Sequence, residues 1–267
     1  MSDGRIAILG GGNLGQALAL GWTRHGGVPA DDVMVTRRRP EHATLLLGGD
    51  VKVSADNPAA VDDADIVILA VQPQQLPALL EEIRGSLPGT RLIVSVASGV
   101  ALESIREALG TDVPVVRAMP NTGASIGASM TCLSADDADE DALQDAAALF
   151  ERLGRTLVIQ ENMMTPATAL CACGVAFFLR CVRAASQGGI EVGFHPEEAL
   201  LLAAQTAHGA AALLLEGEGH PEREIDRVTT PRGCTIAGLN EMEHYGLSSA
   251  LIRGIKLSAD RAAGLAD

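Results

Sequence analysis

The segment Arg5-Ile6-Ala7-Ile8-Leu9-Gly10-Gly11-Gly12-Asn13-Leu14-Gly15 decides the fold of this 267-residue chain. Residues 5–9 have the apolar character of a buried strand, and an apolar helical pattern follows the glycines. The glycines fit the G-x-G-x-x-G spacing: Gly10 allows a tight turn, Gly12 lets a pyrophosphate approach the backbone, and Gly15 permits close helix–strand packing. The segment therefore predicts a dinucleotide-binding βαβ unit. The alternative is a glycine-rich turn that binds no nucleotide.

Strand and helix patterns alternate through the first 160 residues. The run at residues 64–71 is apolar on both faces, as expected of a central strand in a parallel sheet. The alternation predicts an α/β fold with a Rossmann-type doubly wound sheet. The predicted strands cover residues 5–9, 32–36, 51–53, 64–71, 92–96, 114–119, 130–134 and 156–160. After the helix that follows Gly12, the predicted helices cover residues 76–83, 102–109 and 139–153.

The pattern changes after about residue 162, where strand-like runs end. Helical runs are predicted at residues 167–187, 196–216, 235–243 and 248–264. We therefore expect a nucleotide-binding Rossmann domain at residues 1–162 and an all-α domain at residues 163–267. The run at residues 199–215 is apolar on nearly all sides, whereas a surface helix has one apolar stripe. It predicts a homodimer in which a second subunit buries this helix; the alternative is the central helix of a monomeric bundle.

Composition excludes several classes of function. The formal net charge of −14 argues against nucleic acid as a partner, because phosphate backbones require Lys and Arg. No signal peptide is evident and no uninterrupted apolar run approaches the ~20 residues of a membrane span, so we expect a cytoplasmic protein without a membrane partner. Five irregularly spaced cysteines, none with a His at metal-ligand spacing, predict no metal site. We interpret them as mostly buried thiols; a redox pair of Cys171 and Cys173 is the alternative.

The end of the second predicted strand indicates which nucleotide binds. An NAD site places an acidic residue there for the ribose 2′-hydroxyl, but this chain has Thr36 followed by three arginines at positions 37–39. A hydroxyl and guanidinium groups suit a 2′-phosphate, which arginine binds bidentately. The sequence therefore predicts NADP(H) in preference to NAD(H). The alternative is a solvated basic turn.

A second informative segment is residues 228–239, VTTPRGCTIAGL. A Pro-Arg-Gly turn lies between hydroxyl residues, and an apolar helical run follows. Free backbone amides and the positive end of the helix dipole favour an anion, so the segment predicts a site for a small carboxylate.

Six segments together resemble the pyrroline-5-carboxylate reductase family of proline biosynthesis. Met-Pro-Asn-Thr and Thr-Pro-x-Gly-x-Thr are the most specific of their motifs, and the segments occur in the family's order over nearly the whole chain. They are residues 8–15 (ILGGGNLG), 69–74 (LAVQPQ), 95–100 (SVASGV), 116–122 (VRAMPNT), 203–206 (AAQT) and 228–239. The resemblance implies a C-terminal dimerisation domain, dimers or rings of dimers, and sites shared between subunits.

The resemblance, together with the motifs, gives the expected site residues. Residues expected to bind the cofactor are Gly10, Gly12, Asn13, Leu14, Thr36, Arg38, Asn57, Ala70, Val71, Gln72 and Ala97. Residues expected to bind the substrate are Met119, Asn121, Thr230, Gly233, Cys234 and Thr235. The resemblance implies that the loop binds the carboxylate and that Thr235, the expected catalytic residue, bonds the ring nitrogen.

The expected reaction is NADPH-dependent reduction of 1-pyrroline-5-carboxylate to L-proline. The alternatives are reduction of a related cyclic imine carboxylate, such as pyrroline-2-carboxylate, and a nucleotide-binding paralogue without activity. A β-hydroxyacid dehydrogenase is disfavoured, because the predicted helix at residues 167–187 lacks the lysine that such enzymes use. The chain departs from the family at Arg232, Gln72 and Gly123, where the family usually has Gly, Lys and Pro, and at residues 171–176.

Overall fold

The computed structural model describes residues 4–42, 49–136, 139–217 and 219–264. The chain forms two compact units, of which one holds the residues up to Cys173 and from Ser258 onward, and the other holds Gly174–Leu257. A compact unit need not end where a domain ends. The domain limits expected from the sequence, 1–162 and 163–267, therefore stay predictions.

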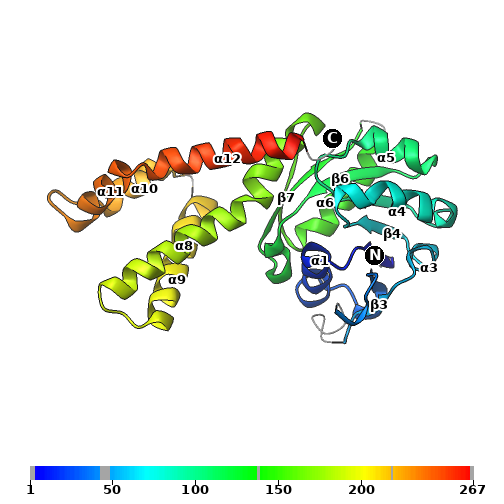
Figure 1. Cartoon of the computed structure of the whole chain (residues 1–267), viewed down its shortest axis with the longest axis horizontal. Coiled ribbons are helices and arrows are strands. Elements are labelled where there is room, and N and C mark those ends of the chain that lie inside the picture. The colour runs from blue at the N-terminus through cyan, green and yellow to red at the C-terminus, as the bar shows by residue number, and fades with distance from the viewer. Residues whose placement is uncertain (1–3, 43–48, 137–138, 218, 265–267) are drawn as a thin grey trace. The chain divides into compact units, whose positions relative to one another are not determined.

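The N-terminal unit contains a twisted sheet with helices on both faces (Figure 1). In the part of the chain described, its strands are β1 (Ile6–Leu9), β2 (Val33–Thr36), β3 (Lys52–Ser54), β4 (Ile66–Leu69), β5 (Leu92–Ser95), β6 (Val115–Met119), β7 (Ser129–Ser134) and β8 (Gly154–Val158). Their order across the sheet is β3-β2-β1-β4-β5-β6-β7-β8. Its helices are α1 (Asn13–Arg24), α3 (Asn57–Asp62), α4 (Leu76–Ile83), α5 (Leu102–Leu109), α6 (Glu140–Glu151) and α7 (Met164–Ala167). The predicted doubly wound α/β fold is confirmed.

Alternate residues of the strands enter two separate cores. Ile6 and Ile8 of β1 pack on the face that carries α1 and α6, whereas Ala7 and Leu9 pack on the face that carries α3, α4 and α5. Each residue of β1 therefore reaches a core, and two-sided burial of this kind explains why the central strands are continuous apolar runs. On the first face the Trp22 indole donates a hydrogen bond of 3.0 Å to the Leu149 carbonyl.

Two strands, β7 and β8, run against the expected direction. β7 pairs antiparallel with β6, with Met119 opposite Cys132, whereas the other neighbouring pairs in the sheet are parallel. A parallel pair requires a crossover of a dozen or more residues, but a short connection with a 3₁₀ turn (Thr122–Ile126) joins β6 to β7. The short connection therefore makes this edge of the sheet mixed rather than parallel throughout.

The second unit is helical. It contains α8 (Gly174–Glu191), α9 (Pro196–Glu216), α10 (Pro221–Val228), α11 (Cys234–His244) and most of α12 (Leu247–Ala263). α8 and α9 pack side by side (Figure 1). The sequence did not predict α10 or α3, because both are short and α10 is strongly polar.

Within the helical unit, α9 is not buried as the central helix of a monomeric bundle would be. Among its described residues only Ala199 is buried, and Leu201 is 69% exposed. Segments Glu161–Glu191 and Pro196–Glu216 are long and apolar enough to cross a membrane, by length and composition alone. Within the second unit, α8 and α9 line an apolar groove of about 730 Å³, with Phe178, Phe194 and Leu202 in its wall. The helical unit alone therefore does not bury α9.

Candidate functional site

The residues expected to bind the cofactor gather at the carboxyl ends of neighbouring strands. Gly10 follows β1, Ala70 follows β4 and Ala97 follows β5, and these strands are adjacent in the sheet. The chain leaves β1 toward β2 on one side and later returns to β4 on the other side, so the strand order reverses at β1. Ligands of open α/β sheets bind outside the carboxyl ends at such a point.

The three motif glycines meet different surroundings. Gly10 has a φ of 119°, and a Cβ on it would lie 2.4 Å from the Ala70 carbonyl oxygen. A Cβ on Gly15 would lie 2.1 Å from the Gly10 carbonyl oxygen. A Cβ on Gly12 would meet no atom within 4 Å. Gly10 and Gly15 are therefore required for packing, whereas Gly12 leaves open space beside its backbone.

The open space lies at the amino end of α1. Gly12 is the N-cap, no side chain caps the helix there, and the first turn has no acidic residue. The half-buried Leu14 and the exposed Asn13 belong to this turn. Uncapped amides and the helix dipole favour an anion, so this cradle fits the pyrophosphate of a dinucleotide.

The loop is fixed by side chains that the sequence analysis did not assign. Gln16 and Arg37 both donate to the Gly11 carbonyl oxygen, over 2.7 and 2.9 Å, and the amides of Gly10 and Gly11 donate to the Thr36 carbonyl. Arg37 was noted only as part of a basic run. Its position directly after β2 was the available signal for this role, since β2 lies beside β1.

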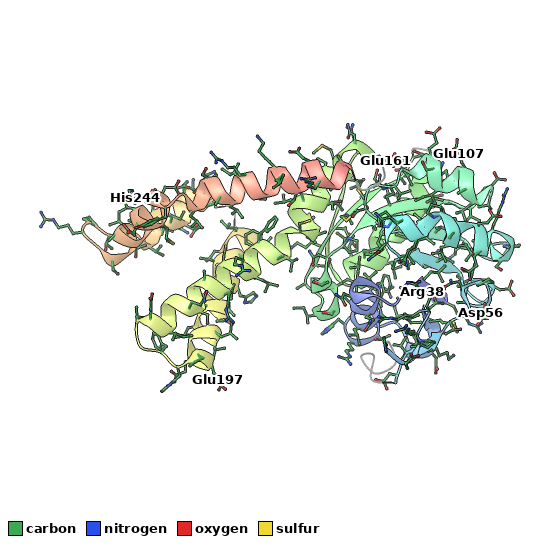
Figure 2. All side chains as sticks on the ribbon, viewed as in Figure 1. Arg38, Asp56, Glu107, Glu161, Glu197 and His244 are labelled. Atoms are coloured by element: carbon green, nitrogen blue, oxygen red, sulfur yellow. The ribbon has the colours of Figure 1, made fainter. Side chains whose placement is uncertain are left out.

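Thr36, at the end of β2, and Arg38, just after it, have different surroundings. Thr36 is buried, and its hydroxyl donates 2.6 Å to the Asn57 side-chain oxygen, while Asn57 donates to Glu82. Arg38, labelled in Figure 2, is exposed. It makes no ion pair with the residues that the structure describes. Thr36 thus positions Asn57 in this structure, and the exposed Arg38 side chain is available to a phosphate. The phosphate role of Thr36 stays a prediction.

The remaining cofactor residues differ in exposure. Val71 and Ala70 are half-buried after β4, Gln72 is exposed before a 3₁₀ turn (Pro73–Gln75), and Ala97 is buried. Their assignments stay predictions.

Asn121 organises the turn that follows β6. Its side-chain oxygen accepts from the Gly123 amide at 2.9 Å, and its side-chain nitrogen donates to the Cys171 carbonyl at 3.3 Å. The buried Met119 ends β6 directly before this turn. A proline at position 123 would have no N–H to donate, so Gly123 permits a hydrogen bond that the family's usual residue cannot form. Asn121 therefore has a positioning role here, and its contact with substrate stays a prediction.

The second unit presents the predicted carboxylate turn. Residues 230–233 close a turn in which the Gly233 amide donates 2.9 Å to the Thr230 carbonyl. Gly233 is the N-cap of α11, with no side-chain cap and no acidic residue in the first turn. A Cβ on Gly233 would lie 2.4 Å from the Thr230 hydroxyl, so a glycine is required beside that oxygen. Exposed Cys234 and half-buried Thr235 begin the helix.

Arg232 has a φ of 60°, the only positive φ of a described non-glycine residue. With Pro231 before it, this φ makes a type II turn, whose third position favours glycine. No contact fixes this φ: the Arg232 side chain is exposed and makes no hydrogen bond or ion pair with the described residues. The turn geometry is kept despite the substitution, at a cost of about 1–2 kcal/mol for an L-residue.

The expected site residues thus form two groups. The cofactor residues, Met119 and Asn121 lie in the N-terminal unit, and Thr230, Gly233, Cys234 and Thr235 lie in the helical unit.

Each half of the chain matches a family model of known proteins. Residues 161–265 match the family model described as pyrroline-5-carboxylate reductase dimerisation. Residues 5–99 match the family model described as NADP oxidoreductase, coenzyme F420-dependent. The chain therefore contains a dimerisation domain and an NAD(P)-dependent oxidoreductase domain.

Curated relatives match over nearly the whole chain. Pyrroline-5-carboxylate reductase 1 of Dictyostelium discoideum is 48% identical over 98% of this chain, which spans 50% of that relative's length. Pyrroline-5-carboxylate reductase 2 of the same organism is 44% identical over 96% of this chain and 91% of the relative. The crystal structure of Plasmodium falciparum pyrroline carboxylate reductase with NADP bound has a TM-score of 0.90 and 20% identity, and the match covers 100% of both chains. The chain belongs to the pyrroline-5-carboxylate reductase family of NAD(P)-dependent oxidoreductases.

Proposed function

We propose that this chain reduces 1-pyrroline-5-carboxylate to L-proline with NADPH. The observation that carries the proposal is the uncapped turn at the start of α11, in which Thr230 lies against Gly233 and Thr235 follows within one turn. The relatives that match over nearly the whole chain carry the name of this reductase, which supports the assignment.

The proposed chemistry requires positioning more than acid–base catalysis. When bound, NADPH supplies a hydride to the carbon of the ring C=N. The uncapped Cys234 amide at the start of α11 binds the ring carboxylate, and the Thr230 hydroxyl donates to it. Gly233 closes the turn that presents this amide, because its own N–H donates to the Thr230 carbonyl. The Thr235 hydroxyl accepts a hydrogen bond from the protonated ring nitrogen and orients the ring. Because the nitrogen already carries a proton, fixing the ring supplies much of the rate enhancement.

The preference for NADPH is proposed to rest on Arg38. An exposed guanidinium without an ion pair binds a 2′-phosphate bidentately, and a charge-assisted hydrogen bond contributes about 1.5–3 kcal/mol. Arg38→Ala should raise the KM for NADPH by about 10-fold or more and leave the KM for NADH unchanged, as steady-state kinetics with both cofactors would measure. Arg39→Ala is the matched control, with the same loss of charge one residue further along. Equal losses with both cofactors would contradict the proposed role of Arg38.

Arg232→Gly should stabilise the chain, since glycine adopts a positive φ without the side-chain penalty. Glycine also costs unfolded-state entropy, so we expect a net gain of about 0.5–1 kcal/mol and a Tm higher by about 2 °C in a thermal melt. The same variant separates two interpretations of Arg232. A higher KM for the carboxylate substrate means that the Arg232 guanidinium binds the carboxylate. An unchanged KM means that arginine at this position has no effect on substrate binding. A lower Tm would contradict the strain that we assign to this turn.

We further propose that the chain works as a homodimer in the cytoplasm, or as a ring of such dimers. The apolar groove between α8 and α9 and the exposed Phe178 and Leu201 support this arrangement, because a second copy would cover them. Coverage by a subunit also accounts for two helices that would otherwise suit a membrane.

A related ring is the main alternative substrate. Pyrroline-2-carboxylate has the same carboxylate and ring nitrogen, but its C=N lies next to the carboxylate. Comparing kcat/KM on the two rings discriminates them, and we expect the 5-carboxylate ring to be preferred. A higher kcat/KM on pyrroline-2-carboxylate would transfer the assignment to that ring. Tight NADPH binding without turnover of either ring would indicate a non-catalytic paralogue.

A further inference from the structure

Two of the five cysteines face each other in the N-terminal unit. The Sγ atoms of Cys132 and Cys171 lie 3.8 Å apart. Cys132 belongs to β7, directly opposite Met119 of β6, and Cys171 belongs to a π-helical turn (Thr168–Ala172). The expected alternative of a Cys171–Cys173 pair is therefore replaced by a pair between elements far apart in the sequence.

The two thiols differ in environment. Cys132 is buried among Met119, Met164 and Ala167, whereas Cys171 packs at the margin of this cluster and is half-buried. A hydrogen bond from the Cys132 thiol lowers the pKa of Cys171 to about 7, and the same bond together with burial raises the pKa of Cys132. Cys171 therefore has the accessible sulfur with thiolate character, and Cys132 has the protonated sulfur beside it.

We propose that Cys132 and Cys171 are an oxidative modification site, which hydrogen peroxide converts to a disulfide. The Cys171 thiolate attacks one peroxide oxygen, the O–O bond breaks, and hydroxide leaves and takes up a proton to form water. The resulting sulfenic acid is attacked by the Cys132 sulfur; the S–S bond forms, the S–O bond breaks, and hydroxide leaves with the Cys132 proton as a second water. Two thiols are oxidised and one peroxide is reduced to two waters.

The remaining cysteines are poor partners for this step. Cys173 is two residues from Cys171, and helical side chains at that spacing do not face each other. Cys181 and Cys234 are exposed, and both belong to the other compact unit. A disulfide needs an S–S separation of about 2.05 Å, so side-chain rotation and a small shift of the π-helical turn must close the 3.8 Å gap.

Closing this gap disturbs the turn that follows β6. The Cys171 carbonyl accepts the Asn121 side-chain amide, and the same side chain binds the Gly123 amide. Moving Cys171 toward β7 therefore weakens the bond that positions Asn121. This consequence rests on the proposed function: we expect the disulfide to lower reductase turnover and a dithiol reductant to restore it.

The first test maps the disulfide without any activity measurement. The full-length protein is treated with increasing hydrogen peroxide, free thiols are alkylated, and proteolytic peptides are analysed by mass spectrometry. We expect a linked pair of peptides carrying Cys132 and Cys171, lighter by two hydrogens. Cys132→Ala should abolish the link and leave a sulfenic acid on Cys171 that dimedone traps, formed more slowly because the variant also removes the hydrogen bond that lowers the Cys171 pKa. Cys171→Ser should give neither the link nor the sulfenic acid. Cys181→Ser is the matched control and should retain the link.

The possible outcomes distinguish a failure of the proposed cysteine site from a failure of the proposed reductase function. A Cys171–Cys173 link, or oxidation confined to Cys181 and Cys234, would overturn the proposal. A Cys132–Cys171 link with unchanged turnover would overturn its coupling to the turn at Asn121. A link in a protein that never turns over pyrroline-5-carboxylate would overturn the proposed function and leave the modification site standing.

Discussion

Gly12→Ala should weaken NADPH binding by about 10- to 100-fold while the protein stays folded. Its φ of −76° and ψ of −170° suit alanine, and the new Cβ would meet no protein atom within 4 Å. The methyl group instead occupies the space in which we expect the pyrophosphate to approach the amides of α1. Losing one hydrogen bond to a charged phosphate costs about 1.5–3 kcal/mol, which corresponds to this loss of affinity. Fluorescence titration of NADPH measures the Kd.

The control must separate an effect on the cofactor from an effect on the fold. Gly85→Ala is matched, because Gly85 lies in the same compact unit and a Cβ there also meets no atom within 4 Å. We expect it to leave the Kd unchanged. Gly12→Ala should lower stability by about 0.5–1 kcal/mol through a poorer N-cap. An unchanged Kd for NADPH in a folded Gly12→Ala variant would contradict the cradle that we assign to this loop.

Glu161→Ala should destabilise the protein by about 3 kcal/mol. The Glu161 carboxylate accepts from Arg117 at 2.9 Å and from the Leu102 amide at 2.8 Å, so it pairs a buried guanidinium and caps α5. The Arg117 side chain is 7% exposed, and its Nε already lacks a hydrogen-bond partner among the described residues. Removing the partner of a buried charge costs about 3–5 kcal/mol, and we take the lower end because Glu161 is 35% exposed.

Thermal and denaturant unfolding both measure this loss, which corresponds to a Tm lower by about 6–12 °C. Asp63→Ala is the matched control, since it breaks an ion pair with Arg5 in which both side chains are more than half exposed; we expect about 1 kcal/mol or less. The double variant Arg117→Met/Glu161→Ala should recover much of the stability, because no buried charge is left unpaired. Equal losses for Glu161→Ala and Asp63→Ala would contradict a structural role for this pair.

The apolar patterns of the strands and helices and the spacing of the glycines were enough to predict most of the fold. The apolar runs that became β1, β4 and β5 are unambiguous in sequence because buried parallel strands have two apolar faces. The antiparallel direction of β7 has no comparable signal, since side-chain alternation is the same in either direction. It follows from the short 3₁₀ connection, which sequence patterns do not distinguish from a loop.

Only part of the candidate site could be predicted, because sequence patterns report local geometry and not contacts between distant segments. Local geometry at Gly10, Gly12 and Gly15 follows from the spacing of the motif, and the structure gives each its expected surroundings. Contacts between distant segments do not follow from spacing: Arg37 on the Gly11 carbonyl, Asn121 on the Cys171 carbonyl, and Cys132 beside Cys171. The φ of Arg232 was also missed, because turn geometry set by neighbouring residues outweighed the preference of arginine.

Reduction of one cyclic imine is the activity that we propose for this chain. Its most direct test is NADPH oxidation by the purified full-length chain in the presence of 1-pyrroline-5-carboxylate, with chromatographic identification of the product. We predict that one L-proline forms for each NADPH oxidised, and that NADH supports the reaction less well. NADPH binding with no pyrroline-5-carboxylate-dependent oxidation would contradict the account.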